Sequence, residues 1–286
     1  MKKLIFSLAL LLTTVFSINA QSTNTLLYQI SGNGLSKPSY VYGTIHLMCE
    51  SDFKMSDELL SKLKETEQVV MELDMDDPSM MMKMQQTMAM DNGVQIKDLV
   101  NEDDYTSLKE YFSTKLGMPL DQMGMIKPFI LSSFMFPSIL GCPIKSYEME
   151  LVKNAQSESK EVIGLETVEF QMNIFNDIPY KDQANMIVEM VDKLDVAKSE
   201  FEMLVQAYKK GNPDEITEMM DQSAFDFGEE AMEKLLKDRN VDWIPKISEI
   251  AKEKSSVFAV GAGHLGGENG ILNLLKKEGF KVTPIL

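Results

Sequence analysis

The sequence predicts an α/β fold of the α+β kind, in which strand–helix–strand units build a central mixed β-sheet and a large helical insertion separates them. Two observations predict this fold. Apolar segments of strand length alternate with amphipathic segments near both ends of the chain, an order typical of parallel βαβ units. The long middle of the chain instead has apolar residues at helical spacing,. With 286 residues, the chain is long enough to bury a large core,.

The first unit lies near the N-terminus. Residues 25–30 and 40–45 have the composition of strands, and the Gly-, Ser- and Pro-rich segment 31–39 between them is a turn,. Ser56 is a plausible N-cap for a helix, because Asp57 and Glu58 would occupy its first turn,. The apolar run 68–73 then follows as a strand.

The same order returns twice. At the C-terminus we expect a strand over 257–260, a helix over 270–277 and a strand over 281–286. Between the two ends, 144–147 is strand-like, 149–156 is helical, and 161–165 is again a strand,. The sequence therefore predicts three strand–helix–strand units.

The remaining segments predict helices over 80–90, 103–116, 180–210 and 213–237,. We expect residues 21–286 to form a single domain whose helix-rich middle covers about 78–140 and 175–240,.

Residues 1–20 have the features of a cleavable signal peptide. Lys2 and Lys3 form a basic start, 4–16 are apolar but too few to span a bilayer, and Ala20 offers a cleavage point,. No later segment is apolar enough for a membrane span. The mature protein is therefore expected to be periplasmic or secreted, without stable membrane insertion.

The chain is acidic, with a formal net charge of −16. A surface of this sign repels nucleic acid and anionic lipid, so the charge argues against a nucleic-acid partner.

Cys49 and Cys142 are the two cysteines. Because export exposes a protein to an oxidising compartment, a disulfide between them is the default expectation. The alternatives are two free thiols, or Cys49 as a metal ligand three residues after His46.

The two histidines have matching surroundings. His46 ends the segment Gly43-Thr44-Ile45-His46, and His264 ends Gly261-Ala262-Gly263-His264. Each is a G-x-x-H motif at the carboxyl end of an apolar strand, where open α/β sheets place their sites. Two ligands of one divalent metal explain the match. Alternatively, each histidine is a hydrogen-bonding residue at a turn.

Carboxylates accompany these histidines. Glu72 lies within the apolar run 69–73, where an unpaired charge would be costly to bury,. Glu166 ends a similar run, and Glu148 ends the strand-like segment 144–147. A metal or a cationic partner would offset the cost at Glu72; alternatively, Glu72 faces outward on an edge strand.

Arg239 is the only arginine of the chain. A single guanidinium among many lysines indicates a role that lysine cannot fill, such as bidentate binding of a carboxylate. The alternative is an ordinary cation near the end of a helix. The sequence has no H-E-x-x-H helix, G-x-S-x-G elbow or Walker loop,.

Five segments together resemble the landmarks of the TraB/PrgY/GumN family. In order they are YVYGTIH, VVMEL, VIGLETVEFQ, LLKDRNVDW and VFAVGAGHLGGENGILNLLKKEGFKV. The resemblance covers nearly the whole mature chain and indicates a secreted bacterial member of the GumN type. The family is related to the TIKI proteins, which are described as metal-dependent proteases with two G-x-x-H motifs.

The resemblance implies a metal site made of His46, Glu72 and His264. It also implies that Glu166, Arg239 and Asn240 are neighbours of this site, where Arg239 and Asn240 would contact substrate. Where bacterial relatives often have Gly-x-Asp before the helix of the unit at 144–165, this chain has Tyr147 and Glu148, which leaves the role of Glu148 open.

The expected function is a metallopeptidase that acts on extracytoplasmic peptides or proteins. Manganese, cobalt or zinc would activate a water molecule, since histidine favours transition metals. Glu166, or else Glu148, would accept the proton of that water. The alternative is a non-catalytic protein that binds a peptide, a metal or haem, in the manner of a pheromone-shutdown or inhibitor protein.

Overall fold

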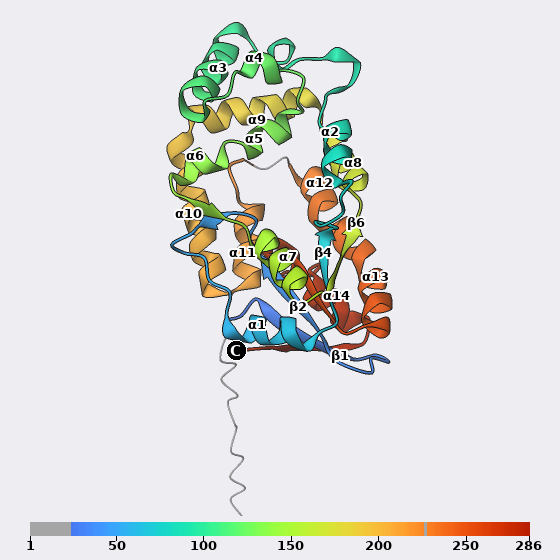
Figure 1. Ribbon diagram of the computed structural model, residues 1–286. Helices are drawn as coiled ribbons and strands as arrows, with labels where there is room; N and C mark the ends of the chain where they lie inside the picture. Colours follow the sequence, from blue (N-terminus) through green and yellow to red (C-terminus); the bar gives the residue numbers. More distant parts are fainter. Residues whose placement is uncertain (1–23, 226–227) are drawn as a thin grey trace, which may run out of the picture.

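A computed structural model of the chain describes residues 24–225 and 228–286. A β-sheet with its covering helices forms one part of the molecule, and a helical part lies beyond one edge of the sheet (Figure 1). The predicted fold class, a mixed sheet with a large helical insertion, is confirmed. The expected signal peptide, residues 1–20, lies outside the described residues.

The main sheet has six strands in the order β6-β4-β7-β2-β1-β8. Their bounds are β1 (Leu27–Gly32), β2 (Ser39–Thr44), β4 (Gln68–Leu73), β6 (Glu161–Glu166), β7 (Ser256–Gly261) and β8 (Phe280–Pro284). Strands β6, β4, β7 and β2 run parallel, whereas β1 is antiparallel to both β2 and β8. The parallel strands therefore all end at one edge of the sheet.

Helices cover the apolar central strands, as parallel sheets require. The main ones are α1 (Asp57–Glu65), α7 (Tyr147–Ser157), α13 (Arg239–Glu253) and α14 (Ile271–Lys277). Helix α7 packs against β4 and β6, whereas α13 packs against β6, β7 and α14. The expected cap of α1 is present, because the Ser56 side chain accepts the backbone N–H of Leu59.

The helical part has a core of its own, around buried residues such as Phe112, Leu131 and Ile187. Its helices and their neighbours are α2 (Met80–Thr87), α3 (Glu102–Leu116), α4 (Leu120–Met123), α5 (Pro128–Ser133), α6 (Phe136–Leu140), α8 (Val168–Asn176), α9 (Tyr180–Asp192), α10 (Leu194–Lys210), α11 (Pro213–Asp221) and α12 (Glu229–Met232). A π-helical turn, Glu233–Asp238, leads from α12 directly into α13.

The single helix predicted over 180–210 is two helices, which meet at Lys193. This residue has φ −120° and ψ 41°, outside the helical region. The bend lets α9 pack on α3 and α5 while α10 packs on α6 and α11. One straight helix over 180–210 could not make both sets of contacts.

The third predicted unit differs from the expectation. Strand β5 (Ile144–Lys145) does not join the main sheet, but pairs antiparallel with β3 (Met48–Cys49) in a separate two-stranded ribbon. Ser146 then caps α7 by accepting the backbone N–H of Met149, so the helix begins at Tyr147. Glu148 therefore lies in the first turn of a helix and not at a strand end.

Within residues 24–225 and 228–286, no helix combines the length and the apolar character needed to cross a membrane.

A disulfide joins Cys49 and Cys142 at the end of the two-stranded ribbon of β3 and β5, with a Cα–Cα distance of 5.6 Å. The bond connects residues that are 93 positions apart in the chain. It therefore links the segment after β2 to the segment before α7.

We expect reduction of this disulfide to lower the free energy of unfolding by about 3–5 kcal/mol, because a closed loop of this length restricts the unfolded chain. Guanidinium unfolding with and without a reductant measures the change. The double variant Cys49→Ala/Cys142→Ala is the control, and its unfolding curve should be the same with and without the reductant. Superimposable curves for the wild type would contradict the expectation.

Candidate functional site

The register of the sheet brings the two G-x-x-H motifs together. Strands β2 and β7 are parallel neighbours, and Thr44 lies opposite Gly261. His46 follows β2 and His264 follows β7, so both histidines leave the sheet at its carboxyl edge. Strand β4 lies on the other side of β7 and carries Glu72 to the same edge.

The first glycine of each motif has a packing reason. A side chain at Gly43 would meet Ala262 and Leu265 at 3.0–3.1 Å, so glycine lets the second motif pack onto the first. A side chain at Gly261 would lie 3.3 Å from Oε1 of Glu72. Glycine there lets the carboxylate approach the backbone, and the Gly261 N–H donates to this oxygen at 2.8 Å,.

Arg239 connects the carboxylates of two neighbouring strands. Its Nε and Nη2 donate to the two oxygens of Glu166, each at 2.9 Å, and Nη2 also donates to Glu72 at 2.6 Å. The Glu166 side chain is fully buried, and 7% of the Arg239 side chain is exposed. As predicted, the only arginine binds a carboxylate through two parallel hydrogen bonds, which lysine cannot do.

Trp243 completes this group one helical turn after Arg239. Its indole N–H donates to Oε1 of Glu166 at 2.9 Å, and the guanidinium lies 4.7 Å from the indole centroid. We call Glu72, Glu166, Arg239, Trp243 and His264 the Arg239 cluster.

Glu72 is held in its ionised form. Burial raises the pKa of its carboxyl, but the neighbouring His264 and Arg239 outweigh this effect and lower the pKa to about 2,. Its second oxygen also accepts a hydrogen bond from the Gln171 side chain at 3.2 Å.

His264 is neutral and has a fixed tautomer. The Asn240 amide nitrogen donates to the backbone oxygens of His264 and Asn269, so its oxygen accepts the Nδ1–H of His264 at 2.7 Å. Burial lowers the pKa of His264 to about 3,. The unprotonated Nε2 therefore faces the cluster, 3.2 Å from Nη1 of Arg239 and 3.9 Å from Oε1 of Glu72.

His46 forms a second, more exposed pair with Glu148. Nδ1 of His46 lies 2.9 Å from Oε1 of Glu148, which also accepts the Thr44 hydroxyl at 2.8 Å. The other oxygen of Glu148 accepts the Ser146 hydroxyl at 2.7 Å. The His46 side chain is 72% exposed, compared with 13% for Glu148.

The two partners shift each other's pKa in opposite directions. Desolvation lowers the pKa of His46, but the hydrogen bond to Glu148 and its charge outweigh it and raise the pKa to about 9. Burial raises the pKa of Glu148, but the contacts with His46, Ser146 and Thr44 lower it to about 2. At neutral pH this pair is therefore an imidazolium and a carboxylate.

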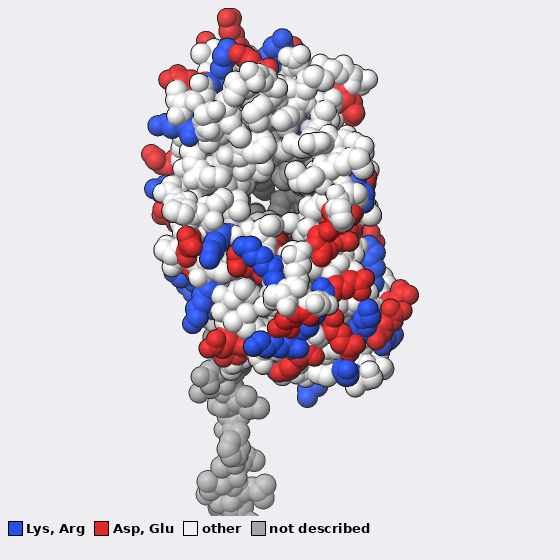
Figure 2. Space-filling view, in the orientation of Figure 1, with Lys and Arg blue, Asp and Glu red and all other residues white. Residues whose placement is uncertain are grey.

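The carboxyl edge of the sheet faces the helical part. In Figure 1 the arrows of β4 and β6 point toward α2 and α8. Figure 2 shows a hollow in the surface between the two parts, with a largely uncharged face above it and acidic and basic side chains below it.

The structure gathers the predicted site residues into two groups. Glu72, Glu166, Arg239, Asn240 and His264 lie together, and His46 pairs with Glu148. Across residues 24–225 and 228–286, no set of three or more His, Cys, Asp or Glu side chains is arranged to hold a metal ion. The metal therefore remains a prediction.

The sequence analysis gave no role to Trp243, Gln171, Thr44 or Ser146. The spacing of Arg239 and Trp243 places them on one face of a helix, and this was the available indication for Trp243. Nothing in the sequence distinguishes Thr44 or Ser146 from other hydroxyl residues near turns.

Comparison with known proteins identifies the family. The family model of the TraB/PrgY/gumN family matches residues 26–284, and the chain belongs to this family. Neither the curated proteins nor the solved structures contain a match to the chain.

We expect Arg239→Lys to destabilise the fold by on the order of 3 kcal/mol, because one ammonium cannot satisfy two buried carboxylates. Chemical unfolding of the variant measures this loss. The matched control is Lys254→Ala, which removes the exposed pair with Glu161 and should cost less than about 1 kcal/mol,. Equal losses in the two variants would contradict the role given to Arg239.

The two histidines should shape opposite halves of the pH–stability curve. The folded pKa of His264 is lowered, so stability is lost as pH falls from about 6.5 toward 3,. The slope is up to about 1.4 kcal/mol per pH unit. The folded pKa of His46 is raised, so its contribution is complete below about 6.5 and is lost as pH rises through 9,.

Urea unfolding at several pH values tests this assignment. His264→Gln should flatten the acid half and leave the alkaline half unchanged. His46→Gln should remove the alkaline loss, and it also changes the acid half, because Glu148 loses the partner that lowers its pKa. The alkaline slope should be the smaller one, because solvent screens the exposed His46 ring,. An alkaline loss that persists in His46→Gln, or an acid slope that is unchanged in His264→Gln, would refute the two pKa assignments.

Proposed function

We propose that the protein is a metal-dependent hydrolase, most closely a metallopeptidase, that acts on peptides or proteins outside the cytoplasm. The observation that supports this proposal best is the convergence of both G-x-x-H motifs and Glu72 at one sheet edge. Export rests on the signal-like residues 1–20,.

The chemistry of the donor atoms suits a divalent transition metal. Nδ1 of each histidine contacts a protein oxygen, from Glu148 or from Asn240, so Nε2 is the nitrogen suited to a ligand. Histidine ligands of metals are commonly oriented in this way. Glu72 is ionised, as a ligand must be,.

His46, Glu72 and His264 are the residues that would hold manganese, cobalt or zinc. Such an ion, when bound, polarises a carbonyl group and lowers the pKa of water. Asn240 keeps the His264 lone pair directed into the site, and Arg239 holds Glu72 in place.

Glu148 is our choice as the proton acceptor. Glu166 was the first expectation, but its side chain is enclosed by Arg239 and Trp243 and has no exposed surface. Glu148 reaches solvent beside His46. Arg239 and Glu166 then act as positioning residues, because they are bound to each other and Arg239 also donates to Glu72.

One contact favours a second candidate function. Nη1 of Arg239 donates to Nε2 of His264, the nitrogen that a metal would need. A protein that keeps this contact would bind a peptide, or another ligand such as haem, at the same edge without hydrolysing it.

We expect the mature protein to bind one manganese, cobalt or zinc ion and to cleave members of an unbiased peptide library. His46→Ala, Glu72→Gln and His264→Ala should each weaken metal binding at least about tenfold, because each removes a ligand. Isothermal titration calorimetry and elemental analysis measure the binding.

Glu67→Gln is the matched control for Glu72→Gln. Glu67 immediately precedes β4, at the opposite end of the strand from Glu72, and pairs with Lys37 at the surface. This control should bind metal like the wild type. Tight metal binding without cleavage would favour the non-catalytic binding protein. If the protein bound none of the three metals, the metal-dependent hydrolase would be ruled out.

A further inference from the structure

The disulfide-linked ribbon carries both members of the His46–Glu148 pair. His46 lies two residues before Met48, the first residue of β3, and Glu148 lies three residues after Lys145, the last residue of β5. Met48 and Lys145 are direct partners in the ribbon. The joining of these two segments is therefore one constraint on the geometry of the pair, beside the Thr44 hydroxyl, which ties Glu148 to the end of β2.

We propose that the Cys49–Cys142 disulfide is the positioning element of the His46–Glu148 pair, so that a dithiol that reduces it loosens this half of the site and leaves the Arg239 cluster ordered. The proposal rests on the proposed function only because it treats this pair as half of the site. The loss of order of His46 and Glu148 on reduction does not depend on any hydrolysis.

The ribbon is too short to hold the two segments by backbone pairing. It consists of two residue pairs, Met48 with Lys145 and Cys49 with Ile144, and one further bond from the Glu50 N–H to the Pro143 oxygen at 2.8 Å. Even a complete two-stranded hairpin is only marginally stable in water. The disulfide is the covalent tie between the segments. It acts beside the Lys145–Glu50 ion pair at 3.4 Å and the Tyr147 hydroxyl, which donates to the Lys54 oxygen at 2.8 Å.

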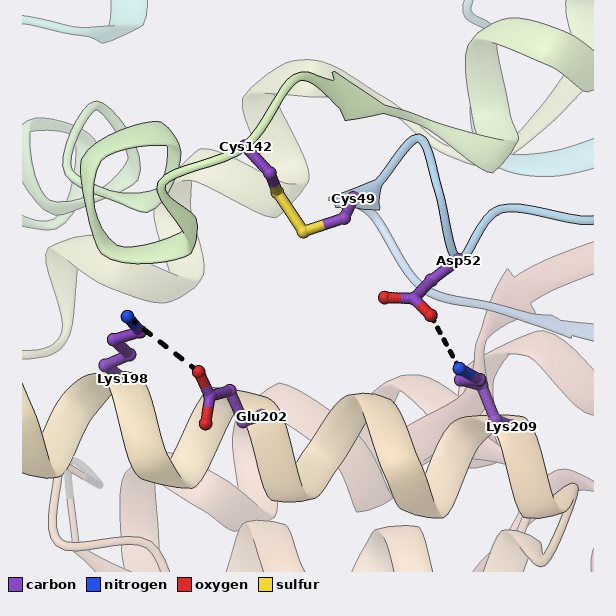
Figure 3. The surroundings of a disulfide bond; sticks show 6 residues. All are labelled: Cys49, Asp52, Cys142, Lys198, Glu202 and Lys209. Atoms are coloured by element: carbon purple, nitrogen blue, oxygen red, sulfur yellow. Dashed lines mark hydrogen bonds and ion pairs between the residues drawn. A yellow bond between two sulfur atoms is a disulfide. The ribbon is translucent and has the colours of Figure 1, made fainter.

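The ion pairs that α10 makes near the ribbon do not join the two segments. Figure 3 shows the disulfide above α10, where Lys209 pairs with Asp52 at 2.5 Å. That ion pair anchors the chain after β3, but it does not reach Cys142 or β5. The nearby pair of Lys198 and Glu202 lies within α10 itself.

The Arg239 cluster has separate support. Its residues come from β4, β6, α13 and the turn after β7, all of which belong to the main sheet or pack on it. No member of the cluster lies in β3 or β5. Loosening of the ribbon thus acts first on His46 and the chain around it, whereas the backbone of Glu148 is also supported by α7, which packs on β4 and β6.

The disulfide is accessible to a reductant. Both cysteines are only partly buried, and Cys49 borders a pocket of about 250 Å³ whose other lining residues include Asp52, Phe201 and Glu202. A thiolate of the dithiol attacks one sulfur to form a mixed disulfide, and its second thiol then closes the ring. The dithiol supplies two electrons and two protons, and both cysteines leave as thiols.

Nuclear magnetic resonance of the imidazole groups tests the proposal, because His46 and His264 are the only two histidines. Dithiothreitol is the probe, at constant pH. Glu148→Gln supplies the reference signals of a His46 that lacks its charged partner. On reduction, the His46 signals should move toward this reference, while those of His264 and the fluorescence of Trp243 stay unchanged.

Amide exchange gives a second readout. Exchange over 46–49 and 144–148 should become about tenfold faster on reduction, with no comparable change in β7. Cys49→Ala/Cys142→Ala should match the reduced protein and ignore dithiothreitol. Lys209→Ala, with the disulfide intact, should keep the wild-type His46 signals.

His46 signals and exchange that are the same in both redox states would overturn the proposal. So would a joint loss of the His264 signals and the native Trp243 fluorescence, since the disulfide would then support the whole fold. These readouts need neither metal nor substrate. A failure of the hydrolase proposal would thus appear in the metal and cleavage assays and leave this test unaffected.

Discussion

The pairing of Arg239 with Glu72 and Glu166 is the interaction on which the candidate site depends. The two carboxylates come from adjacent parallel strands, and both are largely buried. Without a cation between them, desolvation and mutual repulsion would disfavour the ionised pair. The planar guanidinium binds both at once, and helix α13 supplies it one turn before Trp243. The position of α13 against the sheet is thus tied to the geometry of the site.

This constraint gives the two histidines different properties. His264 lies against the arginine and is buried, so it is neutral and its tautomer is set by Asn240. His46 lies outside the cluster, where Glu148 is its partner, and it is charged at neutral pH. Two motifs that match in sequence therefore present one neutral and one protonated imidazole. The difference arises from the neighbours that each loop meets and not from the motifs themselves.

Sequence reasoning predicted the parts of the site that depend on local pattern. An acidic residue inside an apolar run, Glu72, had to have a partner, and the single arginine was a reasonable candidate for it. The G-x-x-H motifs marked the ends of β2 and β7. The sheet order could not be predicted, because β7 enters between β2 and β4 from the far end of the chain.

The errors lie where tertiary contacts override local pattern. Residues 144–147 have strand character, yet the segment pairs with β3 outside the main sheet, and Ser146 starts a helix early. Glu148 was consequently assigned to a strand end, and its contact with His46 was not foreseen. Likewise, Glu166 is enclosed because the indole of Trp243, on α13, donates to it from 77 residues further along the chain.

The charges of the site nearly cancel in the structure without a metal. Glu72, Glu148 and Glu166 are three carboxylates, and Arg239 and protonated His46 supply two positive charges, so one negative charge remains. Loss of the His46 proton would leave two negative charges and would free a nitrogen lone pair at the same time. Two negative charges match a divalent cation, and a deprotonated imidazole is the form that binds a metal. At the proposed metal site, Glu148 would therefore compete with the ion by holding the proton on His46 at neutral pH, and it would orient the same imidazole once the proton has left.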